Sequence, residues 1–310
     1  MKKNTLLFLT LTLIFSFNYS ISFSQCACCA GAGIGSSIGD YNNGVLTLNK
    51  KQWIIESYGD FRSIKDAGTP EEDERLLTKM FIGTAGVRYG LTQNLTLSAI
   101  IPYVFLHTNN GNDKGFGDLD LLATIKLLSK NNLNIALQTG LELPTGVSKP
   151  SAFDNTTVIV GSGSYDPMAG FIVSKKWDKF SMQTNALFKK TTKGFNDNYY
   201  GSLSIQNLSF SYRLIGIDNS CVIDSSRKSS NKLSLSIFGG YYGEWLEKIK
   251  EDNFIDENSG YYAGFFNVGT NVSIKKYSFP ITASMPIISK TNGIQNPPGF
   301  RIRFGVVMLF

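Results

Sequence analysis

The sequence predicts an all-β fold, a transmembrane antiparallel up-and-down β-barrel of about twelve strands. Three observations predict it: short segments of alternating apolar and polar residues recur along the chain, tight and long connections alternate between them, and the chain ends on an amphipathic strand. A period of two residues places apolar side chains on one face of a strand and polar side chains on the other. Such strands suit a wall with an oily outer face and a polar inner face.

The final strand has the clearest alternation. Arg301, Arg303 and Gly305 fall on one face, and the opposite face carries Phe300, Ile302, Phe304, Val306, Met308 and Phe310. A terminal aromatic residue on such a strand resembles the C-terminal signal of bacterial outer-membrane barrels. The resemblance implies an outer-membrane location, contact with membrane lipid, and recognition by the outer-membrane assembly machinery through the strand that ends at Phe310.

The N-terminus has the layout of a secretory signal peptide. Lys2 and Lys3 precede an apolar run over residues 6–17, and small and polar residues then lead to Gln25. The run is shorter than the ~20 residues of a spanning helix. We expect residues 1–25 to be a signal peptide, 26–50 a Cys/Gly-rich periplasmic segment or small plug, and 51–310 the barrel.

Twelve segments have the composition and alternation of strands. They are residues 51–61, 78–90, 95–107, 117–128, 133–143, 165–177, 180–189, 199–214, 232–242, 260–274, 277–288 and 300–310. The connections at 91–94, 129–132, 178–179 and 275–276 are tight, and those between them are long and polar. This alternation fits a barrel with periplasmic turns and external loops.

Two kinds of irregularity are expected within the strands. The apolar phase of segment 199–214 changes between Ile205 and Leu208, which predicts a bulge there. Pro102 and Pro280 lie inside predicted strands, where proline removes a ladder donor and indicates a bulge or a local opening. Such an opening could act as a lateral exit through the wall.

Three glycine-rich motifs occur in order: Gly-Asp-Leu-Asp-Leu at 117–121, Gly-Leu-Glu-Leu-Pro-Thr-Gly at 140–146 and Gly-Ser-Gly-Ser-Tyr-Asp at 161–166. Their order and spacing resemble the outer-membrane transporter family named after the meta-pathway of phenol degradation, over roughly residues 78–310. The resemblance implies a barrel that passes small, often aromatic, molecules. The Gln25 context and the Asn- and Ser-rich style also look like a Bacteroidetes protein.

Inward-facing charges are the candidate selectivity residues. The alternation turns Asp118, Asp120 and Glu142 inward near the outer ends of neighbouring strands, and it places Arg301 and Arg303 at similar height on the last strand. Carboxylates on one wall and guanidiniums on another would create a transverse field for polar solutes. The alternative is pairing with nearer neighbours, with Glu56 and Asp60 facing the two arginines across the barrel seam.

The four cysteines are predicted to share the periplasmic side. Cys26, Cys28 and Cys29 follow the cleavage site, and Cys221 lies in the long connection 216–231. A disulfide that ties the N-terminal segment to this connection is the favoured interpretation. The alternative is a thiolate metal site for a soft ion such as Cu(I).

Other functions have weaker support. The formal charge is +6 and the basic residues are scattered, so we expect no nucleic-acid partner. The acidic run 71–74 is interpreted as a solvated loop. A barrel phospholipase would need a base beside a serine, and the one histidine, His107, has no serine two residues away.

The sequence therefore predicts a channel for small solutes, including aromatic or hydrophobic ones, with no enzyme activity and no cofactor. The alternatives are a structural or metal-linked barrel that uses the cysteine cluster, and the phospholipase, which predicts lipase activity lost in His107→Ala.

Overall fold

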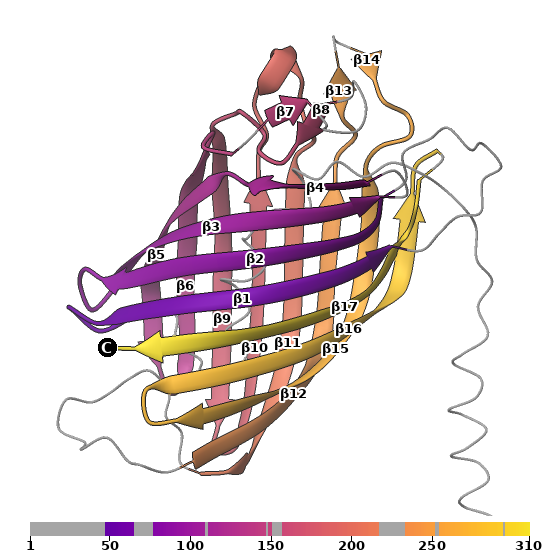
Figure 1. The fold of residues 1–310 in the computed structure, drawn as a ribbon. Helices are drawn as coiled ribbons and strands as arrows, with labels where there is room; N and C mark the ends of the chain where they lie inside the picture. Colours follow the sequence, from indigo (N-terminus) through magenta and orange to yellow (C-terminus); the bar gives the residue numbers. More distant parts are fainter. Residues whose placement is uncertain are drawn as a thin grey trace, which may run out of the picture.

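The computed structural model describes residues 47–64, 77–108, 111–146, 148–150, 157–216, 233–251, 254–293 and 295–310. Within these ranges, twelve long antiparallel strands form a closed barrel (Figure 1). They are β1 (Trp53–Ile64), β2 (Leu77–Gly90), β3 (Leu95–Thr108), β5 (Leu119–Lys130), β6 (Leu133–Leu143), β9 (Asp166–Trp177), β10 (Phe180–Lys189), β11 (Leu203–Ile215), β12 (Leu233–Leu246), β15 (Tyr261–Ile274), β16 (Tyr277–Thr291) and β17 (Pro298–Leu309). The predicted fold class and strand number are confirmed.

Short elements lie at one end of the barrel. They are β4 (Gly111–Phe116), which continues the wall beside β3, the hairpins β7 (Ser148–Pro150) with β8 (Thr157–Ile159) and β13 (Lys250–Glu251) with β14 (Phe254–Ile255), and the 3₁₀ turn η1 (Phe195–Asp197). Among the described residues, no helix has the length and apolar character needed to cross a membrane.

The barrel closes where its first and last strands meet. β1 and β17 pair in antiparallel register, and the pairing begins with Ile54 opposite Leu309. The Trp53 amide donates to the Phe310 carbonyl at 3.0 Å, and the Phe310 amide donates back to the Trp53 carbonyl at 2.9 Å. Because every long strand has a partner on both sides, the wall has no free edge in hydrocarbon.

The two ends of the barrel differ in their connections. Strands β2 and β3, β5 and β6, β9 and β10, and β15 and β16 are joined by tight turns at one end, which we call the turn end. Asn131 and Asn132 both have positive φ, 50° and 60°, as a two-residue hairpin turn of type I′ requires. The long connection between β11 and β12 also joins its strands at the turn end, and the remaining connections join strands at the opposite end, which we call the loop end.

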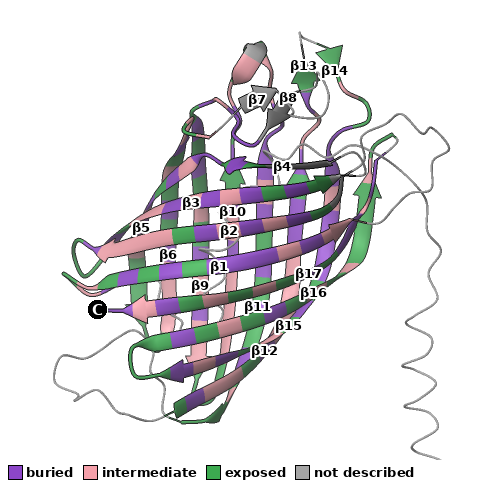
Figure 2. Ribbon diagram, in the orientation of Figure 1, coloured by how far each residue is buried: buried purple, intermediate pink, exposed green. Residues whose placement is uncertain are grey.

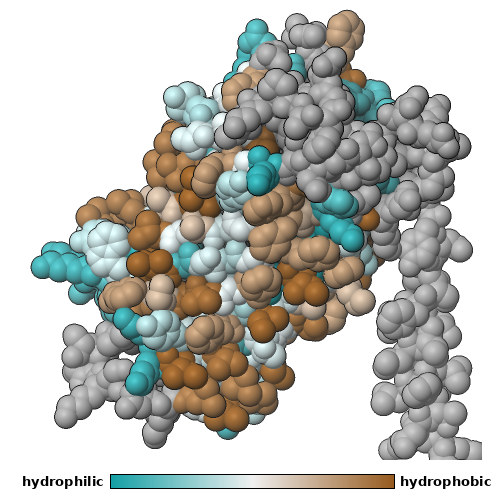
Figure 3. Space-filling view, in the orientation of Figure 1, coloured by the Kyte–Doolittle hydropathy of each residue, from teal (hydrophilic) through white to brown (hydrophobic). Residues whose placement is uncertain are grey.

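The outer face is apolar and the inner face is largely polar, as the alternation predicts. On β5 and β6, Leu121 and Leu141 are exposed while Asp120 and Glu142 are buried inside. Figure 2 shows this alternation as stripes of buried and exposed residues along each strand, and Figure 3 shows apolar side chains over much of the wall. A closed barrel with this polarity is a membrane barrel.

The bulge predicted between Ile205 and Leu208 is wrong. Pairing of β11 with β12 runs without interruption from Ile205 opposite Glu244 to Leu208 opposite Tyr241, and the register shifts only near the turn end, between Arg213 and Ile215. The apolar phase changes because Ile205 faces inward and Leu208 faces outward. The strand is regular, and the interior is apolar at that height.

Both prolines interrupt a ladder, as predicted. Pairing of β3 with β5 stops at Ile100 and resumes with β4 at Tyr103, so Pro102 lies in the gap. Pairing of β16 with β17 omits Phe279 and Pro280. Proline has no N–H to donate, which accounts for both gaps. A lateral exit at either position remains a prediction.

Several predictions lie outside the described residues: the signal peptide, all four cysteines and the acidic run 71–74. The predicted domain boundaries likewise remain predictions. The segment just before β1 is described from residue 47, and there Leu48 is buried against Ile54, Tyr58, Val307 and Leu309. The chain therefore enters β1 from inside the turn end of the barrel.

Candidate functional site

A row of carboxylates lines one inner wall near the loop end. Asp120 on β5 lies opposite Glu142 on β6, and Glu142 lies opposite Asp166 on β9, so three side chains of the same sign stand side by side. Lys189 on β10 donates to both Glu142 oxygens at 2.9 Å. Asp120 is 1% exposed, and neither of its oxygens has a hydrogen-bond partner. This acidic row therefore brings three carboxyl groups and the ammonium of Lys189 together.

Asp118 holds the loop between β6 and β9, which we call the mouth loop. The Gly146 amide donates to one Asp118 oxygen at 2.7 Å. The Ser162 amide and hydroxyl both donate to the other oxygen, the hydroxyl at 2.7 Å. Hydrogen bonds to a charged acceptor are the stronger kind, so one carboxylate joins both halves of this loop to the wall.

The mouth loop contacts the inner wall at Val160. Val160 is buried against Met80, Ile82, Val104 and Leu106, which face inward from β2 and β3. A loop that packs on the inner wall narrows the opening of a barrel, so the contacts of Asp118 and Val160 define a constriction at the loop end.

The three glycine-rich motifs meet at this constriction. A Cβ placed on Gly161 would lie 2.6 Å from the Gly146 Cα and 2.7 Å from an Asp118 oxygen, far inside van der Waals contact. Glycine at both positions allows the two halves of the mouth loop to cross beside Asp118. The motifs of the sequence thus form one three-dimensional unit.

Gly161→Ala is expected to separate the two halves of the mouth loop, at a cost of about 1–3 kcal/mol for the overpacked contact. Proteinase K should then cleave the mouth loop faster in detergent-solubilised protein. The matched control is Gly83→Ala, where the nearest atom to a new Cβ is 3.8 Å away, an ordinary contact. Equal cleavage rates in the two variants would contradict the close approach.

A second charged cluster lies on the first and last strands. Asp60 on β1 accepts hydrogen bonds from Arg62 and from Arg303, each at 2.9 Å. Arg301 on β17 makes two hydrogen bonds to Glu244 on β12, at 3.0 and 2.5 Å. We call this set, Asp60, Arg62, Glu244, Arg301 and Arg303, the basic cluster.

Glu244 is the anchor of the basic cluster. The hydroxyls of Tyr242 and Tyr261 also donate to it, at 3.0 and 2.9 Å. The Arg301 guanidinium lies 4.0 Å from the centre of the Phe265 ring, a cation–π contact. A cavity of about 20 Å³ borders the cluster, room for about one water molecule.

The expected pairing across the seam is correct for one arginine and wrong for the other. Asp60 pairs with Arg303, as predicted. Glu56 instead pairs with Arg88 on the neighbouring β2 at 2.8 Å, and Arg301 reaches past β15 and β16 to Glu244. Glu244 lies beyond the predicted strand end at residue 242, so sequence reasoning missed it.

The acidic row and the basic cluster occupy opposite walls. β10 and β11 separate them on one side of the ring, and β2 and β3 separate them on the other. Each group lies in the loop-end part of its strands. The five sequence-predicted residues therefore divide as expected: Asp118, Asp120 and Glu142 on one wall, Arg301 and Arg303 on the other.

An apolar belt that the sequence reasoning did not predict connects the two walls. Its members are buried inside the barrel on seven strands: Ile100, Leu122, Met168, Leu187, Leu203, Ile205, Leu246, Tyr261, Ala263 and Phe265. The change of apolar phase in segment 199–214 could have indicated this belt, because Leu203 and Ile205 belong to it. The interior at this height therefore contains both charged and apolar side chains.

The described residues contain no group of three or more His, Cys, Asp or Glu side chains that could hold a metal ion. His107, on which the phospholipase alternative rests, is exposed at the loop end of β3.

The fold, the lipid-facing apolar surface and the polar interior define the class of this protein: a bacterial outer-membrane β-barrel. The profile of the family described as "Putative MetA-pathway of phenol degradation" matches residues 77–285, more than half of the chain. The protein belongs to this family, which confirms the resemblance read from the three motifs.

A solved outer-membrane structure shares the fold. The COG4313 outer membrane channel from Pseudomonas putida F1 superposes with a TM-score of 0.61 at 19% identity, over 88% of this chain and 98% of that one. The NanC porin gives 0.45 at 9% identity, over 82% and 98% of the two chains, and the KdgM porin gives 0.44 at 10%, over 83% and 99%. No curated protein sequence matches this chain.

Proposed function

We propose that this protein is a passive outer-membrane channel for small amphipathic solutes, molecules with an aromatic or other apolar part and a polar or charged group. One observation carries the proposal: the apolar belt lies between two oppositely biased charged walls in the loop-end part of the interior. A solute that passes there would meet an apolar surface for its body and charged groups for its polar end.

The opposed walls give this site its electrostatic character. The acidic row and Asp118 supply four carboxylates against the single ammonium of Lys189, and the basic cluster supplies three guanidiniums against two carboxylates. Fixed charges of opposite bias across a narrow space create a transverse field that orients dipolar solutes. We assign selectivity to Asp118, Asp120, Glu142, Arg301 and Arg303 on this ground.

The comparisons support the proposal in general terms. The Pseudomonas structure is named an outer membrane channel, and the family description refers to phenol degradation. Both fit passage of small molecules, and an apolar belt fits solutes with an aromatic ring.

Swelling of liposomes that contain the purified protein tests the function directly. We expect faster swelling with small aromatic acids or alcohols than with sugars of similar size. Ile205→Thr, which replaces the ethyl branch of a belt side chain with a hydroxyl, should reduce this preference while leaving the potassium current of single channels nearly unchanged.

Leu208→Thr is the matched control, because Leu208 faces outward on the same strand and is 37% exposed. It should keep the wild-type preference. Absence of both swelling and single-channel current in folded protein would exclude a channel. A preference that is equal in the Ile205 and Leu208 variants would exclude the belt as the recognition surface.

A further inference from the structure

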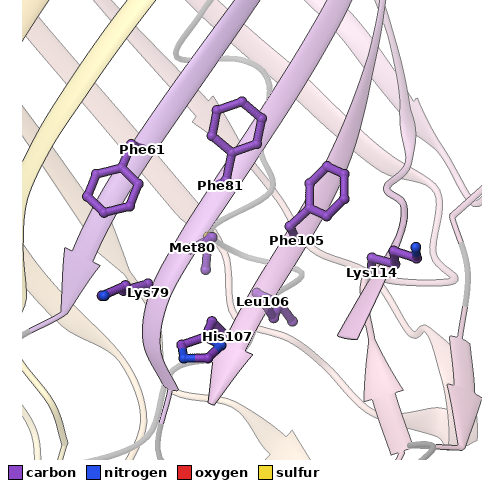
Figure 4. A pocket seen from close by; sticks show the side chains of 8 residues that line it. All are labelled: Phe61, Lys79, Met80, Phe81, Phe105, Leu106, His107 and Lys114. Carbon is purple, nitrogen blue, oxygen red and sulfur yellow. The ribbon is translucent and has the colours of Figure 1, made fainter. Parts of the chain in front are cut away.

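The outer face of the barrel has a cavity of about 520 Å³ near the loop end of β1–β4 (Figure 4). Its lining residues are Phe61, Lys79, Met80, Phe81, Phe105, Leu106, His107 and Lys114. In Figure 4, Met80 and Leu106 point behind the wall, while the three phenylalanine rings lie on the near face. The cavity therefore opens on the surface that contacts lipid.

Its aromatic part is built by strand register. Phe61 lies opposite Phe81, and Phe81 opposite Phe105, so three rings stand in a row across β1, β2 and β3. The centres of the Phe81 and Phe105 rings are 5.9 Å apart. Outward aromatic rings near a strand end belong to the interface between hydrocarbon and headgroups.

The basic side chains of the cavity lie around this row of three phenylalanine rings. Lys114 on β4 stands opposite Phe105, and Lys79 stands opposite His107 one step nearer the strand ends. All three side chains are exposed. In the part of the chain that the structure describes, neither Lys79 nor Lys114 is ion-paired with a carboxylate.

Two lysines at the turn end of the outer wall are placed differently. At the turn end, Lys175 donates to the Asn131 carbonyl at 2.7 Å, and Lys276 lies 4.1 Å from the centre of the Phe310 ring. Charged side chains on a lipid-facing wall are unfavourable unless they lie at the interface. We therefore expect the two exposed lysines beside the aromatic cavity at the loop end to bind an anionic group in the headgroup layer.

We propose that this cavity binds a phosphate-bearing lipid of the outer leaflet. The lipid phosphate accepts hydrogen bonds from Lys79 and Lys114, with the His107 imidazole beside them, and the first carbons of the acyl chains lie on the rings of Phe61, Phe81 and Phe105. Charge complementarity selects this occupant, because basic side chains at a membrane surface attract anionic headgroups. The inference is independent of transport.

The test is retention of lipid by the purified protein in phosphatidylcholine nanodiscs that contain diphosphorylated lipid A, with bound lipid counted by native mass spectrometry. Wild type should retain lipid A and should not retain the same lipid without its phosphates. The double variant Lys79→Gln/Lys114→Gln should weaken retention about twenty-five-fold, the product of two lysines that each contribute about fivefold.

Lys290→Gln is the matched control, since Lys290 is an exposed lysine near the loop end of β16, away from the cavity. It should retain lipid A like wild type, and all variants should show the heat-shifted band of a folded barrel. Equal retention of the dephosphorylated lipid, or unchanged retention in the double variant, would overturn the proposal. Displacement of lipid A by millimolar inorganic phosphate would instead identify a site for the free anion and would also overturn it.

Discussion

Replacing Asp118 with alanine is expected to release the mouth loop and raise the single-channel conductance. The carboxylate accepts hydrogen bonds from the Gly146 amide and from the amide and hydroxyl of Ser162. Each hydrogen bond to a charged acceptor contributes roughly 1.5–3 kcal/mol. Loss of all three bonds removes at least about 4.5 kcal/mol, which shifts the equilibrium between the inward and released loop more than about a thousandfold. Planar-bilayer recordings at fixed salt measure the outcome.

Asp120→Ala separates the effect of the hydrogen bonds from the effect of charge. Asp120 lies two residues away and faces the same interior, but neither of its oxygens accepts a hydrogen bond. Its removal should leave the pore size and the conductance near those of wild type. A similar rise in conductance in both variants would mean that negative charge, and not the hold on the loop, limits the current.

Replacing Glu244 with alanine is expected to cause the largest loss of stability. Arg301 is 7% exposed and would lose its partner inside the barrel, as would the hydroxyls of Tyr242 and Tyr261. Breaking a buried ion pair by removal of one partner costs about 3–5 kcal/mol, because a charge is left buried and uncompensated. The urea midpoint for refolding into lipid vesicles, followed by tryptophan fluorescence, measures the change.

Two further variants test whether the buried charge pair is the source of this loss of stability. Glu257→Ala removes the exposed partner of Lys248 in a loop and should alter stability by only about 0–1 kcal/mol. Combining Glu244→Leu with Arg301→Met removes both charges and should recover most of the loss. A double variant as unstable as Glu244→Ala would show that the charge pair is not the source of the effect.

Local pattern was sufficient to predict the wall of the barrel. The exposed Leu121 and buried Asp120 of β5 were assigned to the correct faces, because a period of two depends only on neighbouring residues. The Asn131-Asn132 turn was equally local, since its positive φ angles suit a two-residue hairpin. Strand number followed from these features.

Contacts between strands that are not neighbours in the barrel could not be predicted from local pattern. Arg301 pairs with Glu244 across two intervening strands, a distance set by the curvature of the closed wall and the length of the side chain. The bulge predicted near Ile205 failed for a related reason: the inner face was assumed to be polar at every height, and the apolar belt breaks that assumption. The hold of Asp118 on the mouth loop also depends on three segments that meet only in the folded chain.

The seam between β1 and β17 has a consequence for biogenesis. Asp60 and Arg303, which meet across it, are separated by 243 residues of sequence, so their contact forms only when the complete chain is in the membrane. Pairings of such high contact order form late and slowly during folding. A polypeptide truncated before its last strand would present the open edge of β1 to hydrocarbon, with its peptide groups unpaired. Closure of the ring between β1 and β17 therefore favours full-length molecules over fragments.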